Sequence, residues 1–313
     1  MRAGIVLAFG LSLLTGDAGA KGLGLILPTF GLESLPVYEA QEQGYFAKRG
    51  LEIEVSAARG GGGEAMKAFI SGDVTILATG FPEVGELKAR GVDVVMLVGQ
   101  LTRSPFAVVA RKDLGITTIA GLKGKDIGVS SPGSMTESLA RYLAIGQGWD
   151  PKRDIGVVAL GGGGEILGAL VGKKVDAAVL FEPFASSGIR NGTLTMVMDL
   201  AKELDAFPTA PLVVQREFLE KSPKEARDLH DAMVESLAYI HANRDGAFAL
   251  VRKKFPGADP EVLKAAYDRL YPIFSPDGKL SRDSLERTQK ICMQLGLIHQ
   301  IYAYDDIVAP FNR

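Results

Sequence analysis

A five-residue segment that occurs twice constrains the fold of this chain more than any other feature. Gly60-Gly61-Gly62-Gly63-Glu64 recurs 101 residues later as Gly161-Gly162-Gly163-Gly164-Glu165. The same offset, without a gap, brings three more identical residues into register: Ala68 on Ala169, Val74 on Val175 and Pro82 on Pro183. Each copy runs in the order loop, helix, strand and proline, so a whole supersecondary unit is repeated. The chain is therefore expected to contain two similar α/β lobes.

The hydrophobic pattern before Pro223 supports two such lobes. Apolar runs with strand character alternate with helical stretches, which is typical of α/β proteins with parallel sheets covered by helices on both faces. Strands are predicted at residues 51–56, 74–78, 92–98, 126–130, 155–160 and 177–180. Helices are predicted at residues 36–48, 64–71, 82–90, 134–147 and 165–172. Beyond Pro223 only helical periodicity is found, at residues 224–243, 259–270 and 281–296, so this region should pack on the earlier sheets.

Two similar segments indicate how the lobes are joined. Residues 104–111 (SPFAVVAR) and 210–216 (APLVVQR) are short apolar strands that begin near a proline and end with a basic residue. We interpret them as two crossover strands, with ordinary sheet strands as the alternative. Lobe 1 then comprises residues 21–104 and 216–313, and lobe 2 comprises residues 105–215, both crossover strands included. Two crossovers make a hinge whose closure can bury a ligand between the lobes.

Residues 1–20 have the pattern of a secretory signal peptide. Arg2 precedes an apolar run at residues 5–14, and Ala18-Gly19-Ala20 fits a cleavage site. An ordinary buried strand or helix is the alternative, because the run is shorter than the roughly 20 residues that span a bilayer. The one cysteine, Cys292, does not follow the predicted cleavage site. We therefore expect an exported, soluble, periplasmic protein without a lipid anchor or an internal disulfide.

Several loops have the composition of ligand-binding turns at the carboxyl ends of strands. Residues 130–137 (SSPGSMTE) follow a predicted strand and open a helix, and Ser134 and Glu137 have capping-box spacing. The N–H groups and partial positive charge of a helix N-terminus suit an anion, although these hydroxyls could equally serve the helix alone. The glycine quartets offer the same backbone donors. Phe81 and Phe181 are candidates for an apolar wall, with core packing as the alternative.

The search for catalytic motifs gives a negative result. The three histidines, His230, His241 and His299, all lie in the C-terminal helical region, and no metal-binding, nucleotide-binding or nucleophile-elbow motif is found. With 35 basic and 37 acidic residues the chain also lacks the excess positive charge of a nucleic-acid-binding protein. These observations favour binding over catalysis, and we expect no catalytic residue, cofactor, metal or nucleic-acid partner.

The order of the motifs resembles the nitrate/sulfonate/taurine class of periplasmic solute-binding proteins, which deliver substrates to ATP-binding-cassette (ABC) importers. The resemblance extends from about Gly31 to Leu219 and rests on residues 36–40 (PVYEA), 44–51 (GYFAKRGL), 60–63 (GGGG), 121–129 (GLKGKDIGV), 131–134 (SPGS) and 182–184 (EPF). It implies the two-lobe, two-crossover fold of the type II periplasmic binding proteins. It also implies a small-molecule ligand and a membrane permease as partner, and a shuttle of this kind is most simply a monomer.

By resemblance, the ligand contacts fall in the loops between the lobes. They are Glu33, Ser34, Leu35, Gly61, Gly62, Thr79, Gly80, Phe81, Ser131, Gly133, Ser134, Met135, Thr136, Phe181 and Glu182. Phe181 stands where the family often has a tryptophan.

We expect a small organic anion as the ligand, with a second ligand class as the alternative. Helix N-termini favour a small organic anion, a sulfonate or a carboxylate. Glu33 and Glu83, in candidate pocket loops, suit such an anion poorly and favour a heterocyclic or cationic compound such as a thiamine-precursor pyrimidine. The third hypothesis is an enzyme of this fold. The absence of two features argues against it, since the pyrimidine-making relatives depend on a histidine and a cysteine-rich motif that are not found here.

Overall fold

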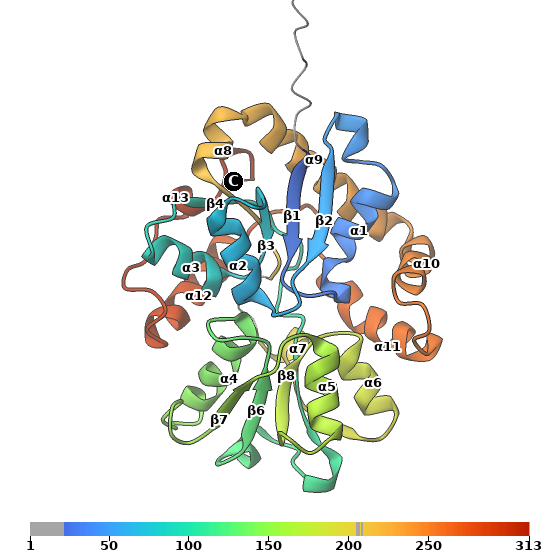
Figure 1. The fold of residues 1–313 in the computed structure, drawn as a ribbon, viewed down its shortest axis with the longest axis vertical. Helices are drawn as coiled ribbons and strands as arrows, with labels where there is room; N and C mark the ends of the chain where they lie inside the picture. Colours follow the sequence, from blue (N-terminus) through green and yellow to red (C-terminus); the bar gives the residue numbers. More distant parts are fainter. Residues whose placement is uncertain (1–21, 205–206, 208, 313) are drawn as a thin grey trace, which may run out of the picture.

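Two five-stranded sheets, one above the other in Figure 1, form the framework of the molecule. The structure is a computed structural model and describes residues 22–204, 207 and 209–312. The expected signal peptide, residues 1–20, lies outside the described residues. Within the described part of the chain, no helix combines the length and the apolar character that crossing a membrane requires.

The first sheet has the strand order β2-β1-β3-β10-β4. Its strands are β1 (Leu23–Leu27), β2 (Ile53–Ala57), β3 (Ile76–Ala78), β4 (Val94–Val98) and β10 (Leu212–Gln215). β1 pairs in parallel with β2 and β3, whereas β10 runs antiparallel between β3 and β4. The sequence analysis predicted no strand at β1. This short apolar run (LGLIL) comes soon after the signal-like segment and contains no polar side chain, so it shows no alternation of polar and apolar residues.

The second sheet repeats this topology with the strand order β7-β6-β8-β5-β9. Its strands are β5 (Ala107–Arg111), β6 (Asp126–Val129), β7 (Gly156–Ala159), β8 (Ala177–Leu180) and β9 (Leu194–Asp199). β5 is the antiparallel strand here and occupies the position that β10 holds in the first sheet. The repeated glycine segments open equivalent helices, α2 (Gly62–Ser71) and α5 (Gly163–Val171). The two-lobe α/β prediction is confirmed.

The two crossover strands exchange between the sheets, which corrects the predicted lobe boundary. β5 follows β4 of the first sheet but pairs in the second, and β10 follows β9 of the second sheet but pairs in the first. Residues 212–215 therefore belong to the first sheet, and not to lobe 2 as expected from the sequence. Each crossover strand enters its sheet at the carboxyl ends of the parallel strands, so it must run opposite to them. The sheets are mixed for this reason, and not purely parallel.

The helices cover both faces of each sheet and form the C-terminal region. Besides α2 and α5 they are α1 (Leu35–Glu42), α3 (Phe81–Ala89), α4 (Met135–Gly146), α6 (Phe184–Arg190), α7 (Leu200–Glu203), α8 (Arg216–Lys221), α9 (Pro223–Ala242), α10 (Arg244–Lys254), α11 (Pro260–Leu270), α12 (Arg282–Gln294) and α13 (Tyr304–Ile307). The helix expected at residues 36–48 stops at Glu42, because Gly44 adopts a positive φ of 70°. α10 was not expected as a separate helix.

The C-terminal helices complete the hydrophobic core of the first lobe, as the sequence predicts. Leu229 and Leu237 of α9 and Tyr267 of α11 pack in one buried cluster with β1 residues and with Leu35 and Val37 of α1. Figure 1 shows α9, α10 and α11 following one another around the right-hand side of this lobe. The C-terminal third of the chain is therefore part of lobe 1 and not a separate domain.

Candidate functional site

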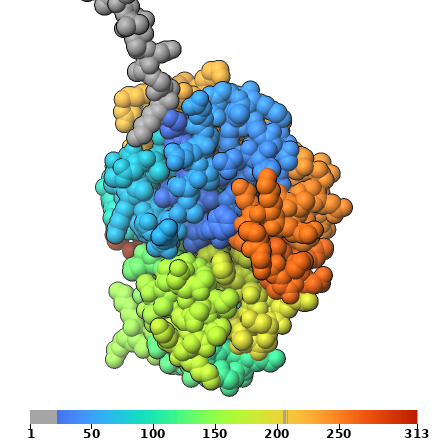
Figure 2. Space-filling model, turned by 45° about the vertical axis from the view of Figure 1, so that its right-hand side comes forward, coloured from blue at the N-terminus to red at the C-terminus, as the bar shows by residue number. Residues whose placement is uncertain are grey.

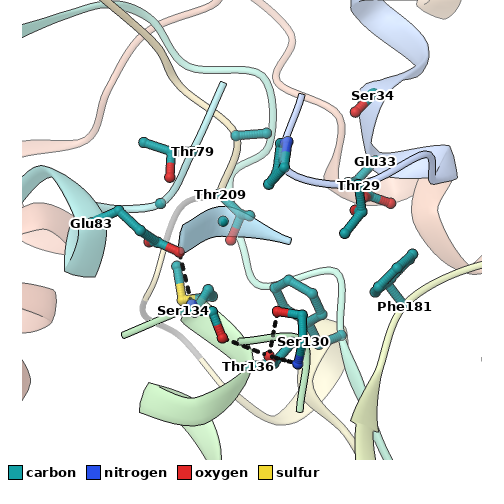
Figure 3. A pocket seen from close by; sticks show the side chains of 16 residues that line it. Thr29, Glu33, Ser34, Thr79, Glu83, Ser130, Ser134, Thr136, Phe181 and Thr209 are labelled. Atoms are coloured by element: carbon teal, nitrogen blue, oxygen red, sulfur yellow. Dashed lines mark hydrogen bonds between the residues drawn. The ribbon is translucent and has the colours of Figure 1, made fainter. Parts of the chain in front are cut away.

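A cavity lies between the two lobes, at the carboxyl ends of the parallel strands (Figure 3). The centre of a water molecule can occupy about 40 Å³ of it. Its walls are Pro28, Thr29, Glu33, Ser34, Gly62, Thr79, Gly80, Glu83, Phe106, Ser130, Ser134, Met135, Thr136, Phe181, Thr209 and Ala210. Both lobes and both crossover segments contribute. The prediction of two lobes joined by a hinge places the ligand at this position.

The structure brings together most of the residues that the sequence predicts for the site. Those that line the cavity are Glu33, Ser34, Gly62, Thr79, Gly80, Ser134, Met135, Thr136 and Phe181. They come from the turn before α1, from the N-terminal ends of α2 and α4, and from the loops after β3 and β8. The capping-box segment and one of the two glycine quartets therefore do meet at one place.

Six predicted residues do not line the cavity, and three of these belong to the protein interior. Leu35 and Phe81 point into the two hydrophobic cores, with at most 1% of each side chain exposed. Glu182 is fully buried and forms an ion pair with Arg269 of α11. For Phe81, core packing was the stated alternative.

The other three, Gly61, Ser131 and Gly133, shape the loops around the cavity. The Ser131 hydroxyl accepts a hydrogen bond from the Gly63 N–H at 3.1 Å, which joins the two lobes. Gly133 N–H donates to the Glu137 carboxylate at 2.7 Å within the capping box. Gly61 has a φ of 76°, and a Cβ at this position would lie 2.9 Å from the Cβ of Ser130 in the other lobe, so the close approach of the lobes requires glycine.

Sequence reasoning missed several lining residues. Pro28 and Thr29 follow β1, a strand that was not predicted, and Phe106, Thr209 and Ala210 lie in the crossover segments. These segments reach the cavity only because of the exchange between the sheets. Glu83 was noted as a carboxylate in a candidate pocket loop but was not assigned to the site, and its place in the cavity is a result of the tertiary structure.

Glu83 is a buried carboxylate that contacts both lobes. It lies in the first turn of α3, and its Oε1 accepts a hydrogen bond from the Met135 N–H, at the N-terminus of α4, at 2.8 Å. Its Oε2 is buried without a hydrogen-bond partner. Burial raises the pKa of Glu83 to about 7, although the N–H groups around it oppose that rise.

Glu33 is the second buried carboxylate and lies on the opposite side of the cavity from Glu83 (Figure 3). Thr29 Oγ1 donates a hydrogen bond to Glu33 Oε1 at 2.9 Å, and Glu33 Oε2 has no partner. Burial raises the pKa of Glu33 to about 7, and the nearby Glu182 carboxylate adds to the rise. Thr79 Oγ1 is a third buried oxygen of the cavity wall without a partner. The cavity therefore presents unused hydrogen-bond acceptors from two sides.

The hydroxyl groups of lobe 2 are largely engaged with one another. Thr136 Oγ1 lies 3.0 Å from Ser130 Oγ and 2.9 Å from Ser134 Oγ, and it accepts a hydrogen bond from the Ser130 N–H at 2.9 Å. The Ser134 hydroxyl also caps α4 by accepting from the Glu137 N–H. The capping motif thus serves the helix while its hydroxyls border the cavity, and their contact with a ligand stays a prediction.

Among the residues that the structure describes, no basic side chain lines the cavity. Arg59 and Arg103, which the sequence placed beside the candidate loops, are not among its walls, and Arg103 donates to the carbonyl of Lys202. Phe106 and Phe181 supply an apolar wall, with ring centroids 6.4 Å apart in an edge-to-face arrangement. Among the residues that the structure describes, no group of histidine, cysteine, aspartate or glutamate side chains could hold a metal ion.

Comparisons with known proteins agree with this architecture. A protein of Bacillus subtilis (strain 168), named "Putative binding protein YtlA", is 25% identical over 279 residues, which cover 87% of this chain and 83% of that protein. Among solved structures, the alkanesulfonate-binding protein SsuA from Xanthomonas axonopodis pv. citri, bound to MOPS, superposes with a TM-score of 0.77 at 17% identity and covers 92% of this chain and 98% of its own.

The periplasmic aliphatic sulphonate binding protein SsuA from Escherichia coli gives a TM-score of 0.71 at 18% identity, over 90% of this chain and 94% of its own. These likenesses show that the chain has the fold of the periplasmic binding proteins, as the resemblance implied. The protein family described as NMT1/THI5 like matches residues 32–247. Since this match spans well over half of the sequence, the chain belongs to the NMT1/THI5-like family.

Proposed function

We propose that the chain is an exported solute receptor of an ABC importer that binds a small molecule in the cavity between its lobes. The observation that carries this proposal is the cavity itself, since both lobes and both crossover segments supply its walls. A ligand held there contacts both lobes and both crossover segments at once. Its binding therefore favours the closed arrangement over one in which the lobes are apart. The receptor, a periplasmic monomer, then presents the ligand to the membrane permease.

The side chains of the cavity favour a ligand that donates hydrogen bonds and is neutral or cationic. An anion would face two buried carboxylates, Glu33 and Glu83, and none of the described lining residues is basic and could compensate them. A ligand with N–H groups at two positions supplies what Glu33 Oε2 and Glu83 Oε2 lack. Phe106 and Phe181 suit a flat apolar body between these donors.

The N-terminus of α4 supports the same choice. Helix N-termini were the sequence-based reason to expect an organic anion. Here the Met135 N–H at this end already donates to the protein's own Glu83 carboxylate, and the Gly133 N–H donates to Glu137. An anionic ligand would therefore have to displace acceptors that the fold provides. Of the two ligand classes that the sequence left open, the donor-bearing one is the better supported.

Calorimetric titration with matched pairs of compounds tests the ligand class. Each pair keeps one carbon skeleton and changes the head group, as benzamidine and benzoate do, and aminopyrimidines, alkylamines and the corresponding sulfonates extend the panel. We expect binding only among the amidines, amines and aminoheterocycles. Selective binding of carboxylates or sulfonates would reverse the assignment of the ligand class while leaving the receptor function in place.

Solution scattering tests the receptor function separately from the ligand class. The radius of gyration should decrease when a ligand from the panel binds, since closure brings the lobes together. Native mass spectrometry of protein purified without added ligand reports both the oligomeric state and the mass of any co-purified compound. Turnover of a bound compound by the purified protein would instead favour an enzyme of this fold.

A further inference from the structure

A buried arginine of the C-terminal region connects the first lobe to the second. Arg269 lies on α11 and has 9% of its side chain exposed. Its Nε donates to Asp199 Oδ1 at 2.9 Å, and its Nη1 lies 3.2 Å from Glu182 Oε1. Nη1 and Nη2 donate to the backbone carbonyls of Pro105 and Phe106 at 2.8 and 2.6 Å. One guanidinium thus holds two carboxylates and two carbonyl groups.

The helix that carries Arg269 is anchored in the first lobe. Leu263, Ala266, Tyr267 and Leu270 of α11 are buried in the same hydrophobic cluster as β1 and α1. In Figure 2 the orange C-terminal helices extend down from this lobe across the boundary and lie against the second lobe. Arg269 is therefore a first-lobe residue whose side chain ends inside the second lobe.

The groups that Arg269 holds are next to the cavity wall and the crossovers. Phe106, whose carbonyl it binds, and Phe181, which precedes Glu182, form the aromatic wall of the cavity. Asp199 ends β9, immediately before the second crossover. The Glu182 backbone carbonyl also accepts a hydrogen bond from Leu32 N–H of the first lobe at 3.0 Å. The arginine thus binds where both crossovers meet the second sheet, without touching the cavity.

We propose that Arg269 is a positioning residue that holds the lobes in the closed arrangement and fixes Phe106 and Phe181 in the cavity wall. A planar guanidinium can satisfy carbonyl and carboxylate groups on several sides at once, which a lysine ammonium does not do with the same geometry. The C-terminal helices then take part in the ligand-controlled movement, and are more than a cover for the first sheet. This role rests on the proposed receptor function but does not depend on the charge of the ligand.

Distances between spin labels on the two lobes, measured without any ligand, test this role. Labels are attached at Lys67→Cys on α2 and Lys174→Cys before β8, both exposed positions, while Cys292 is fully buried and out of reach of the reagent. The ligand-free wild type should populate the short, closed distances in part. In the Arg269→Lys variant we expect this short-distance fraction to fall and the distribution to shift to longer values, with the thermal unfolding curve still cooperative. An unchanged distribution would overturn the proposal.

A second variant removes the risk that an uncompensated carboxylate unfolds the protein. Arg269→Met combined with Glu182→Gln and Asp199→Asn leaves no buried charge at this place and should also lengthen the distances. If this variant keeps the wild-type distribution, Arg269 only balances charge and the proposal is wrong. Arg190→Lys is the matched control, because Arg190 of α6 pairs with Asp259 beside α11 at the surface, and this exposed pair should leave the distribution unchanged.

Discussion

The two lobes share one topology but bring different chemistry to the cavity between them. At the repeat offset of 101 residues, Gly80 of the first lobe corresponds to Phe181 of the second, and Glu83 corresponds to Phe184. Gly80 and Phe181 both line the cavity, whereas Glu83 reaches into it and Phe184 packs against Phe181, with ring centroids 5.5 Å apart. The repeated backbone therefore carries a polar side in the first lobe and an aromatic side in the second.

The glycine quartets show the same divergence. Gly62 lines the cavity, but its counterpart Gly163 does not, because the ring of Phe184 lies where a Cβ of Gly163 would stand. Both carboxylates of the cavity come from the first lobe, whereas its hydroxyl groups come from both lobes and from the second crossover segment. An internal repeat thus predicts where a site lies between lobes, but not which lobe holds which group.

The largest expected effect is the pH dependence of the free energy of unfolding, which tests the two carboxylates that the first lobe brings to the cavity. The pKa values of Glu33 and Glu83 rise from 4.5 to about 7 on folding, so the folded protein keeps two protons that the unfolded chain releases. The free energy of unfolding should therefore fall between pH 4.5 and 7, by about 3 kcal/mol for each carboxylate. Urea unfolding of the wild type and of Glu33→Gln/Glu83→Gln across this range measures the difference. Parallel curves would contradict it.

Ligand affinity should depend strongly on the same two carboxylates. A hydrogen bond to a charged group contributes about 1.5–3 kcal/mol, so the double variant should bind a donor-bearing ligand about 100-fold more weakly or worse. Titration calorimetry with the tightest compound of the panel gives the value. Glu39→Gln is the matched control, since Glu39 is equally buried but lies outside the cavity. Equal binding by the double variant and the wild type would show that the carboxylates do not contact the ligand.

Alanine substitutions at the equivalent residues Gly62 and Gly163 distinguish an effect on ligand binding from an effect on core packing. Gly163→Ala should destabilise the protein by about 1–3 kcal/mol, because the new methyl group meets the Phe184 ring. Gly62→Ala should change stability by less than about 1 kcal/mol but weaken ligand binding, since its Cβ stands 3.0 Å from Glu83 Oε1. Thermal unfolding and titration of both variants make the comparison. The same response in both variants would mean that the two loops play the same role.

The smallest expected effect is at the capped helix of the second lobe. The Ser134 hydroxyl accepts a hydrogen bond from the Glu137 N–H at the start of α4, whereas the glycine-opened helices α2 and α5 have no side-chain cap. Ser134→Ala should lower the free energy of unfolding by about 1 kcal/mol. Denaturant unfolding detects this change, and an unaltered midpoint would indicate that the hydroxyl serves the cavity and not the helix.

The sequence by itself determined the architecture of this protein. The repeat at an offset of 101 residues, the strand–helix alternation and the two proline-led strands indicate two lobes with two crossovers, and the structure has both. These features are local, because a helix or strand is specified by the spacing of apolar residues within one segment. The capping box at Ser134 and Glu137 was readable for the same reason.

Only the tertiary structure decided the chemistry of the cavity. Arg269 meets Glu182 across 87 residues and Glu83 meets Met135 across 52, and no local spacing encodes such pairs. The same holds for Thr209 and Ala210, which reach the cavity because the crossover strands exchange between the sheets. Whether a glutamate binds a ligand, caps a helix of the other lobe or pairs with a distant arginine depends on what the chain brings beside it after folding.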